Sequence, residues 1–206
     1  MAQALDFPGE WFFDNNTHTL SLWLPNSDSP TNHVIESKAR LYAFNLQGKS
    51  YITISDLSIV AASVYGPDTS YITLQNVDIT YAGHSMWVPA STQGVFSIAA
   101  VSFNPGNFNQ LLDSNIMYSA GAGIYSYGVH NVAQNNVFGY LSYAPLLESV
   151  RMPMSTFSGL DAGSNRSLIM QNTLFMCGEP QIYVSNGNDI KLMMPTTSNC
   201  NELIWE

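Results

Sequence analysis

An internal repeat of 20 residues restricts the possible folds of this chain more than any other feature of its sequence. SYITISDLSI, at Ser50–Ile59, recurs as SYITLQNVDI, at Ser70–Ile79. In each copy apolar residues alternate with small or polar ones, which is typical of a β-strand, and the spacing of three between Ile54 and Leu57 indicates a bend. A strand repeat of this length predicts a solenoid in which each coil buries its apolar residues against the next.

Looser copies of the repeat continue along the chain. With the apolar residue after the bend as the marker, the steps are 20 residues from Leu57 to Val77, 39 to Ile116, 21 to Val137 and 37 to Leu174. The later copies then carry one extra residue at the bend. Each long step predicts an irregular coil or a loop, and GVFSIAAVSF at 94–103 is expected to supply a strand in the first.

The polar residue at each bend is expected to stack on its counterpart in the next coil. Asn suits such a column because it tolerates the left-handed backbone conformation and can hydrogen-bond its neighbours. By the same alignment Tyr118 falls in line with the inward Ile59 and Ile79 and is expected in the core. The expected bend residues are Asp56, Asn76, Asn115, Asn136 and Asn172.

The segment before the repeats has the pattern of a β-hairpin. GEWFFDNNTHTLSLWLP, at Gly9–Pro25, places two short strands at 11–13 and 19–24 around a turn rich in Asp and Asn. We therefore predict an all-β chain, a right-handed parallel β-helix with an N-terminal hairpin, and a β-sandwich as the structural alternative. Residues 1–206 are expected to form a single domain, with the hairpin at 9–25, regular coils at 34–143 and irregular or divergent coils at 144–206.

The charge balance narrows the possible partners. Six Lys and Arg stand against fifteen Asp and Glu, for a net charge of −9, so nucleic acid is not an expected partner. An acidic polysaccharide would need a bridging cation such as Ca²⁺, which is the one possible cofactor; no transition-metal motif is present.

The sequence has no run that predicts a membrane-spanning helix and no export signal at its start. Cys177 and Cys200 could form a disulfide or remain free thiols.

The hairpin segment, the strand of AFNLQGKSYITISDLSI and the later SAGAGIYSYGVHNVAQNNVF resemble the bacterial right-handed β-helix repeat proteins of the pectate-lyase-like superfamily. The resemblance covers roughly 9–143. The resemblance implies a parallel β-helix fold. Because members of this superfamily are commonly secreted and many are polysaccharide lyases or glycoside hydrolases, it also implies secretion and one of these activities. In such proteins further coils tend to precede the hairpin, whereas eight residues precede Gly9 here, which suggests a truncated or divergent member.

The candidate catalytic residues are those expected to face outward near the long excursion between 81 and 109. On a solenoid, substrate lies across the outward side chains of one sheet, and loops form the walls. Asp78 alternates with the inward Val77 and Ile79, and carboxylates on neighbouring coils fall within the separations that glycosidases use. The set is Asp78, His84, Asp113 and Glu148, and a solvated or structural role is the alternative for each.

Aromatic residues gather in the same stretch and are the candidate substrate-binding residues. Flat rings with polar tips suit the apolar faces of sugars, although rings of this kind also pack in cores. The set is Trp87, Tyr125, Tyr127, Tyr140 and Tyr143.

Three functions follow from this sequence. The first is a glycoside hydrolase acting on an extracellular polysaccharide, favoured because carboxylates are available and bases are scarce. The second is a Ca²⁺-dependent polysaccharide lyase, for which Lys38 and Arg40, one alternating position apart on an expected strand, are the best-placed bases. The third is a non-catalytic glycan-binding or structural fragment, and its open solenoid ends would favour self-association.

Overall fold

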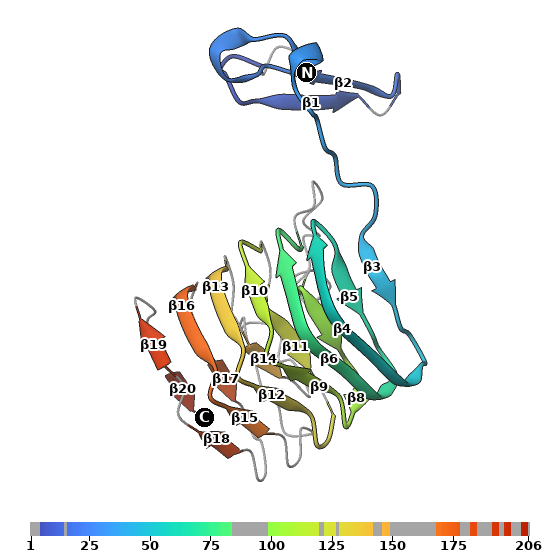
Figure 1. The fold of residues 1–206 in the computed structure, drawn as a ribbon, viewed down its shortest axis with the longest axis vertical. Helices are drawn as coiled ribbons and strands as arrows, with labels where there is room; N and C mark the ends of the chain where they lie inside the picture. The colour runs from blue at the N-terminus through green and yellow to red at the C-terminus, as the bar shows by residue number, and fades with distance from the viewer. Residues whose placement is uncertain are drawn as a thin grey trace. The chain divides into compact units, whose positions relative to one another are not determined.

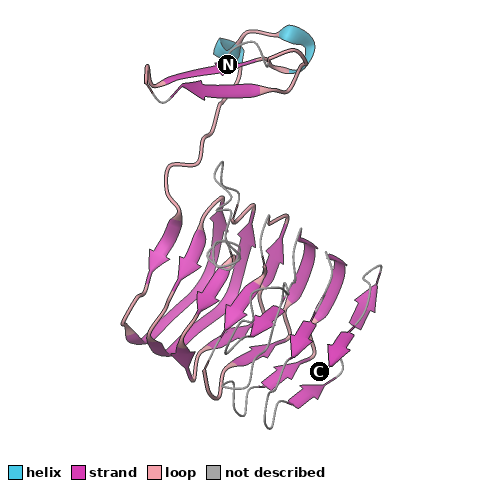
Figure 2. Cartoon of the chain, turned by 180° about the vertical axis from the view of Figure 1, so that it is seen from behind, coloured by secondary structure: helices cyan, strands magenta, loops and turns pink. Residues whose placement is uncertain are grey.

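The computed structural model describes residues 5–14, 16–83, 99–119, 122–126, 128–141, 146–148, 168–177, 182–184, 191–193, 196–198 and 203–205. The chain divides into two compact units, residues 1–39 and residues 40–206. Helical structure in the described residues is limited to two short 3₁₀ segments in the first unit, and strands make up most of the second (Figure 2).

The first unit is built on the predicted hairpin. β1 (Trp11–Asp14) pairs antiparallel with β2 (Thr19–Leu22), and η2 (Pro25–Ser27) and η3 (Pro30–Asn32) follow. The register places Trp11 opposite Leu22 and Phe13 opposite Leu20, so one face of the hairpin is apolar. None of the described residues of this unit is fully buried.

The second unit consists of parallel strands that follow one another in chain order along a stack (Figure 1). It begins with β3 (Tyr42–Asn45), the long β4 (Ser50–Val60), β5 (Ser63–Tyr65) and the long β6 (Thr69–Thr80). The later strands are β7 (Val101–Phe103), β8 (Gly106–Asn107), β9 (Gln110–Leu112), β10 (Asn115–Met117), β11 (Ile124–Ser126), β12 (Val132–Gln134), β13 (Val137–Leu141), β14 (Leu146–Glu148), β15 (Leu168–Met170), β16 (Thr173–Cys177), β17 (Ile182–Val184), β18 (Lys191–Met193), β19 (Thr196–Ser198) and β20 (Leu203–Trp205).

Two curled sheets hold these strands. In the eleven-stranded sheet, the first half of β6 is continued by β9, β12, β15 and β18, and its second half by β10, β13, β16 and β19. The seven-stranded sheet runs β3, β5, β7, β11, β14, β17 and β20. Pairing between described strands of this unit is parallel, which is incompatible with the hairpin connections of a β-sandwich. The predicted repeat is present, since β4 and β6 pair from Ser50↔Ser70 to Val60↔Thr80.

A left-handed residue turns the chain at each bend. Asp56 and Asn76, at the predicted bends of β4 and β6, have φ of 58° and 51°, and the bend residues of the next three levels also have positive φ. The register corrects the expected column, because Asp113 and Asn135, not Asn115 and Asn136, stand in line with Asn76. The column of bend residues is Asp56, Asn76, Asp113, Asn135 and Gln171.

The residue after each bend points into the core, and this explains the error in the expected alignment. Val77 is 1% exposed. The register places Ser114 in the same inward position on the next level of the sheet, and Asn136 in that position on the level after it. Ile116 therefore pairs with Ile79 and not with Val77, and the later copies carry no extra residue at the bend. A search for apolar markers could not find this alignment, because the inward position had become polar.

Buried amides replace apolar packing in that position. Asn136 and Asn172 are each 1% exposed, and Asn136 Oδ1 accepts from Ser114 N at 3.0 Å. Asn136 Nδ2 donates to Leu111 O at 2.9 Å and to Asn172 Oδ1 at 3.0 Å. Because every polar atom of this column has a partner among backbone groups or the next amide, burial carries little desolvation penalty.

Candidate functional site

The second half of β6, together with β10, presents a mostly polar surface that we call the outer face, made of Asp78, Thr80, Asn115 and Met117. Asp78 and Asn115 are exposed, while Val77 and Ile79, which alternate with Asp78, are buried. The alternation of a strand thus turns Asp78 outward, as predicted. Asn115 Nδ2 donates to Asp78 Oδ1 at 2.7 Å, across the Asn115↔Asp78 register pair.

One border of the outer face is the amide column, made of Asp56, Asn76, Asp113 and Asn135. Asn76 Nδ2 donates to Asp56 Oδ1 at 2.7 Å, and Asn135 Nδ2 donates to Asp113 Oδ1 at 2.8 Å. Hydrogen bonds from the side chains of Asn76 and then Ser55 lower the pKa of the Asp56 carboxyl. The left-handed backbone at these positions favours Asn and Asp, and it aligns their side chains one strand spacing apart.

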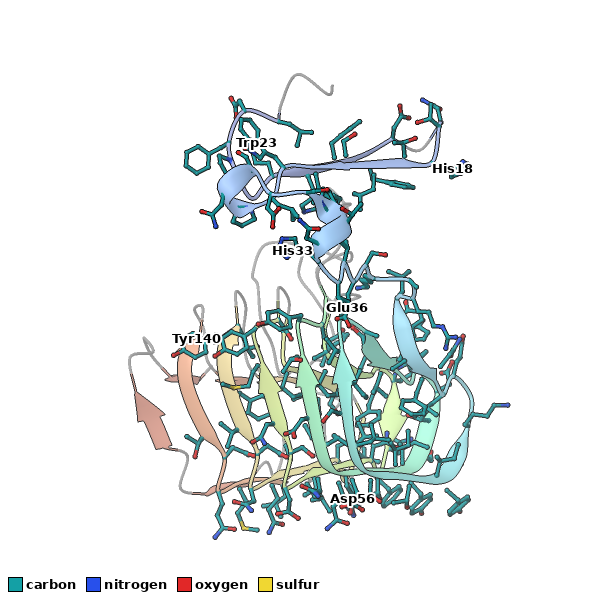
Figure 3. All side chains as sticks on the ribbon, turned by 45° about the horizontal axis from the view of Figure 1, so that its top comes forward. His18, Trp23, His33, Glu36, Asp56 and Tyr140 are labelled. Atoms are coloured by element: carbon teal, nitrogen blue, oxygen red, sulfur yellow. The ribbon has the colours of Figure 1, made fainter. Side chains whose placement is uncertain are left out.

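The other border is the tyrosine column, made of Tyr81, Tyr118 and Tyr140. Ring centroids lie 5.5 Å apart between Tyr81 and Tyr118 and 4.9 Å apart between Tyr118 and Tyr140, with the rings nearly parallel. Tyr118 is 42% exposed, which corrects its expected place in the core. In Figure 3 Tyr140 and Asp56, one from each column, lie at opposite ends of the strand segments between them.

The tyrosines of this column present ring edges to solvent because each ring stacks face to face on the next. Each of the three has a positive φ, which is unfavourable for a bulky side chain. Ring stacking offsets that cost by about 0.5–1.5 kcal/mol per pair. A sugar on the outer face would therefore meet hydroxyl groups and ring edges along this border.

A second aromatic column, of Tyr51, Tyr71, Phe108 and His130, lies at the first bend of the long strands. Neighbouring ring centroids are 4.8 Å apart throughout. The His130 ring stacks on Phe108, which gives this histidine a structural position in the bend.

The two described candidate carboxylates lie close to each other on the sheet. Asp113 stands opposite Asn76 in the register, so it is one strand over and two residues along from Asp78. With strands about 4.8 Å apart and about 3.3 Å per residue in an extended strand, the two Cα atoms are at most about 8 Å apart, because the bend at Asn76 shortens the path. Asp113 also accepts from Gln75 Nε2 at 3.3 Å, so amides of the neighbouring strands hold both carboxylates.

The structure separates the other predicted site residues. Tyr125 lies on β11 and is only 8% exposed, so its ring is packed within the protein and offers little surface to a glycan. Glu148 is the last residue of β14, and its backbone pairs with Ser126 of β11. Both strands belong to the seven-stranded sheet, whereas Asp78 lies in the eleven-stranded sheet. His84, Trp87, Tyr127 and Tyr143 lie outside the described residues.

The bases suggested for a lyase are placed differently from the prediction. Lys38 and Arg40 precede β3 and lie outside any strand. Burial lowers the pKa of the Lys38 ammonium group.

Sequence reasoning missed the residues that hold the carboxylates, above all Gln75 and Asn115. Their signal was present as polar residues at outward strand positions, but the two-residue error in alignment concealed which of them become neighbours. Within the residues that the structure describes, no cluster of three or more His, Cys, Asp or Glu could hold a metal ion. No described helix is long and apolar enough to cross a membrane.

Searches with this chain against family models, curated proteins and solved structures give no match.

Proposed function

We propose that residues 40–206 form a right-handed parallel β-helix. The parallel register of β4, β6, β10, β13 and β16, with the same inward and outward positions at each level, supports this proposal. Right-handed crossovers between parallel strands of one sheet are the rule in proteins, which supports the handedness. Kinship with the pectate-lyase-like superfamily is part of the same proposal and depends on the sequence motifs alone.

We further propose that the chain is a carbohydrate-active protein, a glycoside hydrolase that acts on an extracellular polysaccharide across the outer face. The observation that carries this proposal is the pair of exposed carboxylates, Asp78 on β6 and Asp113 at the bend between the neighbouring strands β9 and β10. In inverting enzymes one carboxyl group protonates the leaving oxygen and the other activates water, with about 6.5–9.5 Å between the two carboxyl groups, and two residues this near on a sheet can hold their carboxyl groups in that range. The scarcity of Lys and Arg favours a neutral glycan over an acidic one.

The geometry supports a division of roles between the two borders of the outer face. Tyr140 and Tyr118 provide hydroxyl groups and ring edges for a bound sugar, while Asp113 belongs to the amide column on the opposite border and Asp78 lies two residues along the chain from Asn76 of that column. Trp87, Tyr127 and Tyr143 remain predicted sugar-binding residues, and His84 and Glu148 remain predicted catalytic residues. Secretion and a bridging Ca²⁺ for acidic substrates also remain predictions.

The experiment is incubation of the chain with neutral and acidic polysaccharides, with reducing ends and unsaturated products measured together. We expect new reducing ends without unsaturated product, and a loss of at least about tenfold in rate for Asp78→Asn and for Asp113→Asn. Asp56→Asn is the matched control. Asp56 belongs to the same column as Asp113, and asparagine at this position keeps a side-chain oxygen that can accept the hydrogen bond from Asn76. Hydrolysis that survives both Asn substitutions unchanged contradicts the catalytic assignment.

A non-catalytic glycan-binding or structural role is the second candidate. The observation that favours it is that Asp78 and Asp113 both accept hydrogen bonds from amides of adjacent strands, as side chains do in a purely structural column. Binding of a polysaccharide without product release would select this candidate. Unsaturated product would instead select the lyase.

A further inference from the structure

The tyrosine column holds phenol rings against one another at neighbouring levels of the sheet. The rings of Tyr118 and Tyr140 lie 4.9 Å apart between centroids with 10° between their planes, and those of Tyr81 and Tyr118 lie 5.5 Å apart with 18°. Rings at these separations are in van der Waals contact. Tyr118 N donates to Gly139 O at 3.1 Å, so the backbone fixes the two levels in register at this bend. All three tyrosines belong to the compact unit of residues 40–206, and the fold of that unit keeps their phenol groups side by side.

Tyrosine is conformationally unfavourable at these positions. The three residues have a left-handed backbone, with φ between 51° and 56°, which Gly, Asn or Asp would adopt more readily. Stacking alone does not require a hydroxyl group, because the second aromatic column continues from Tyr71 through Phe108 to His130 with ring centroids 4.8 Å apart. The tyrosine column is made of phenols alone, and the chemical property that a phenol adds to a stacked ring is its ready one-electron oxidation.

Oxidation of two phenols in contact gives a covalent bond between them. Loss of one electron and the phenolic proton converts each tyrosine into a phenoxyl radical, whose unpaired spin lies partly on the ring carbons next to the one that bears the oxygen. Two such radicals join through a bond between these carbons, and the hydrogen of each joined carbon passes to its phenol oxygen. Side chains that are 42% and 45% exposed, as Tyr118 and Tyr140 are, can rotate so that the ring edges meet. In total two electrons and two protons leave the pair, and one molecule of hydrogen peroxide takes them up to form two molecules of water.

We propose that the tyrosine column is a site of oxidative cross-linking, at which a peroxide-driven one-electron oxidant joins Tyr118 to Tyr140 through a carbon–carbon bond. Tyr81 is the second partner of Tyr118, and its longer centroid distance makes it the minor one. Tyr118 follows β10 and Tyr140 lies in β13, so the bond ties neighbouring levels of the sheet together. A cross-link of this kind stabilises the folded chain by restricting the unfolded one, as a disulfide does.

The experiment is treatment of the intact chain, at low protein concentration, with hydrogen peroxide and a haem peroxidase, followed by proteolysis and mass spectrometry. We expect a peptide pair that is joined between Tyr118 and Tyr140 and is two hydrogen atoms lighter than its separate peptides. Dityrosine fluorescence appears in parallel, the yield does not change with protein concentration, and the treated chain keeps the mass of a single chain under denaturing conditions. A treated chain with no bond at Tyr118, or with bonds only between separate chains, overturns the proposal.

Conservative variants test whether stacking directs the reaction. Tyr118→Phe keeps a ring for stacking and removes the central phenol, so it loses the cross-links of the column while keeping the wild-type circular dichroism spectrum. Tyr140→Phe leaves the phenols of Tyr81 and Tyr118, and the cross-link moves to that pair. Tyr51→Phe is the matched control, because it removes a phenol from a different stacked pair, Tyr51 and Tyr71, and leaves the cross-link at Tyr118 unchanged. If Tyr51→Phe lowers the Tyr118–Tyr140 product as much as Tyr140→Phe does, stacking does not direct the reaction and the assignment of the site is refuted.

Discussion

Replacing Asn136 with alanine removes an amide that three separate backbone or side-chain groups use. Ser114 N donates to its Oδ1 at 3.0 Å, and its Nδ2 donates to Leu111 O at 2.9 Å and to Asn172 Oδ1 at 3.0 Å. Asn136 is 1% exposed, so water cannot readily replace these contacts. Alanine leaves the buried Ser114 N without this acceptor. At about 1–3 kcal/mol for an unsatisfied buried group, the free energy of unfolding falls by about 1–3 kcal/mol.

Denaturant unfolding, followed by circular dichroism, measures this change. The matched control is Asn135→Gly, which keeps a residue that accepts the φ of 55° and removes one exposed hydrogen bond to Asp113. We expect the control to lower the free energy of unfolding by less than about 1 kcal/mol. If Asn136→Ala costs no more than Asn135→Gly, the hydrogen bonds of the buried amides do not stabilise the stacking of the strands.

Two further predictions concern local geometry and pH. Gly128 has a φ of 142°, and a Cβ there would collide with the Gly106 carbonyl oxygen. Gly128→Ala should therefore lower the midpoint of thermal unfolding, and should lower the free energy of unfolding by at least about 2 kcal/mol. Wild-type stability in this variant would refute the close approach of the two backbones. The pKa of Asp28 lies below its usual range, with the hydrogen bond from His33 at 2.7 Å as the largest cause, followed by Ser29 N and Asn32. A lowered carboxyl pKa stabilises the fold above the unfolded-state pKa, and this contribution is lost as the pH falls through the folded-state value. A carboxyl titration by NMR should show a higher Asp28 midpoint in His33→Ala than in the wild type, and an unchanged one would contradict the assigned cause.

The fold class was largely predictable because the two best copies of the repeat carry complete local information. Alternating apolar residues in 50–59 and 70–79 predict strands, a spacing of three predicts the bend, and the structure confirms both in β4 and β6. The hairpin was predictable from turn chemistry at 14–18, and β1 and β2 confirm it. Each of these features depends on residues close together in the sequence, where side-chain period and backbone conformation are directly linked.

The candidate site was predictable only in part. Asp78 faces outward as expected, because strand alternation alone decides its direction. Tyr125 was expected to bind substrate, but it is 8% exposed, and no local sequence pattern could reveal this burial. The predicted core position of Tyr118 was wrong, because the prediction depended on an alignment between levels that assumed apolar residues at every inward position.

By itself, the sequence of this chain determined the strand period, the bends and the side of the strand on which Asp78 lies. Only the tertiary structure decided which levels align, because register depends on contacts between residues far apart in the chain. Ser114 and Asn136 could replace the inward Val77 only because neighbouring levels of the sheet supply their hydrogen-bond partners. A buried amide looks like a surface residue in the sequence, and its partners exist only once the strands have paired.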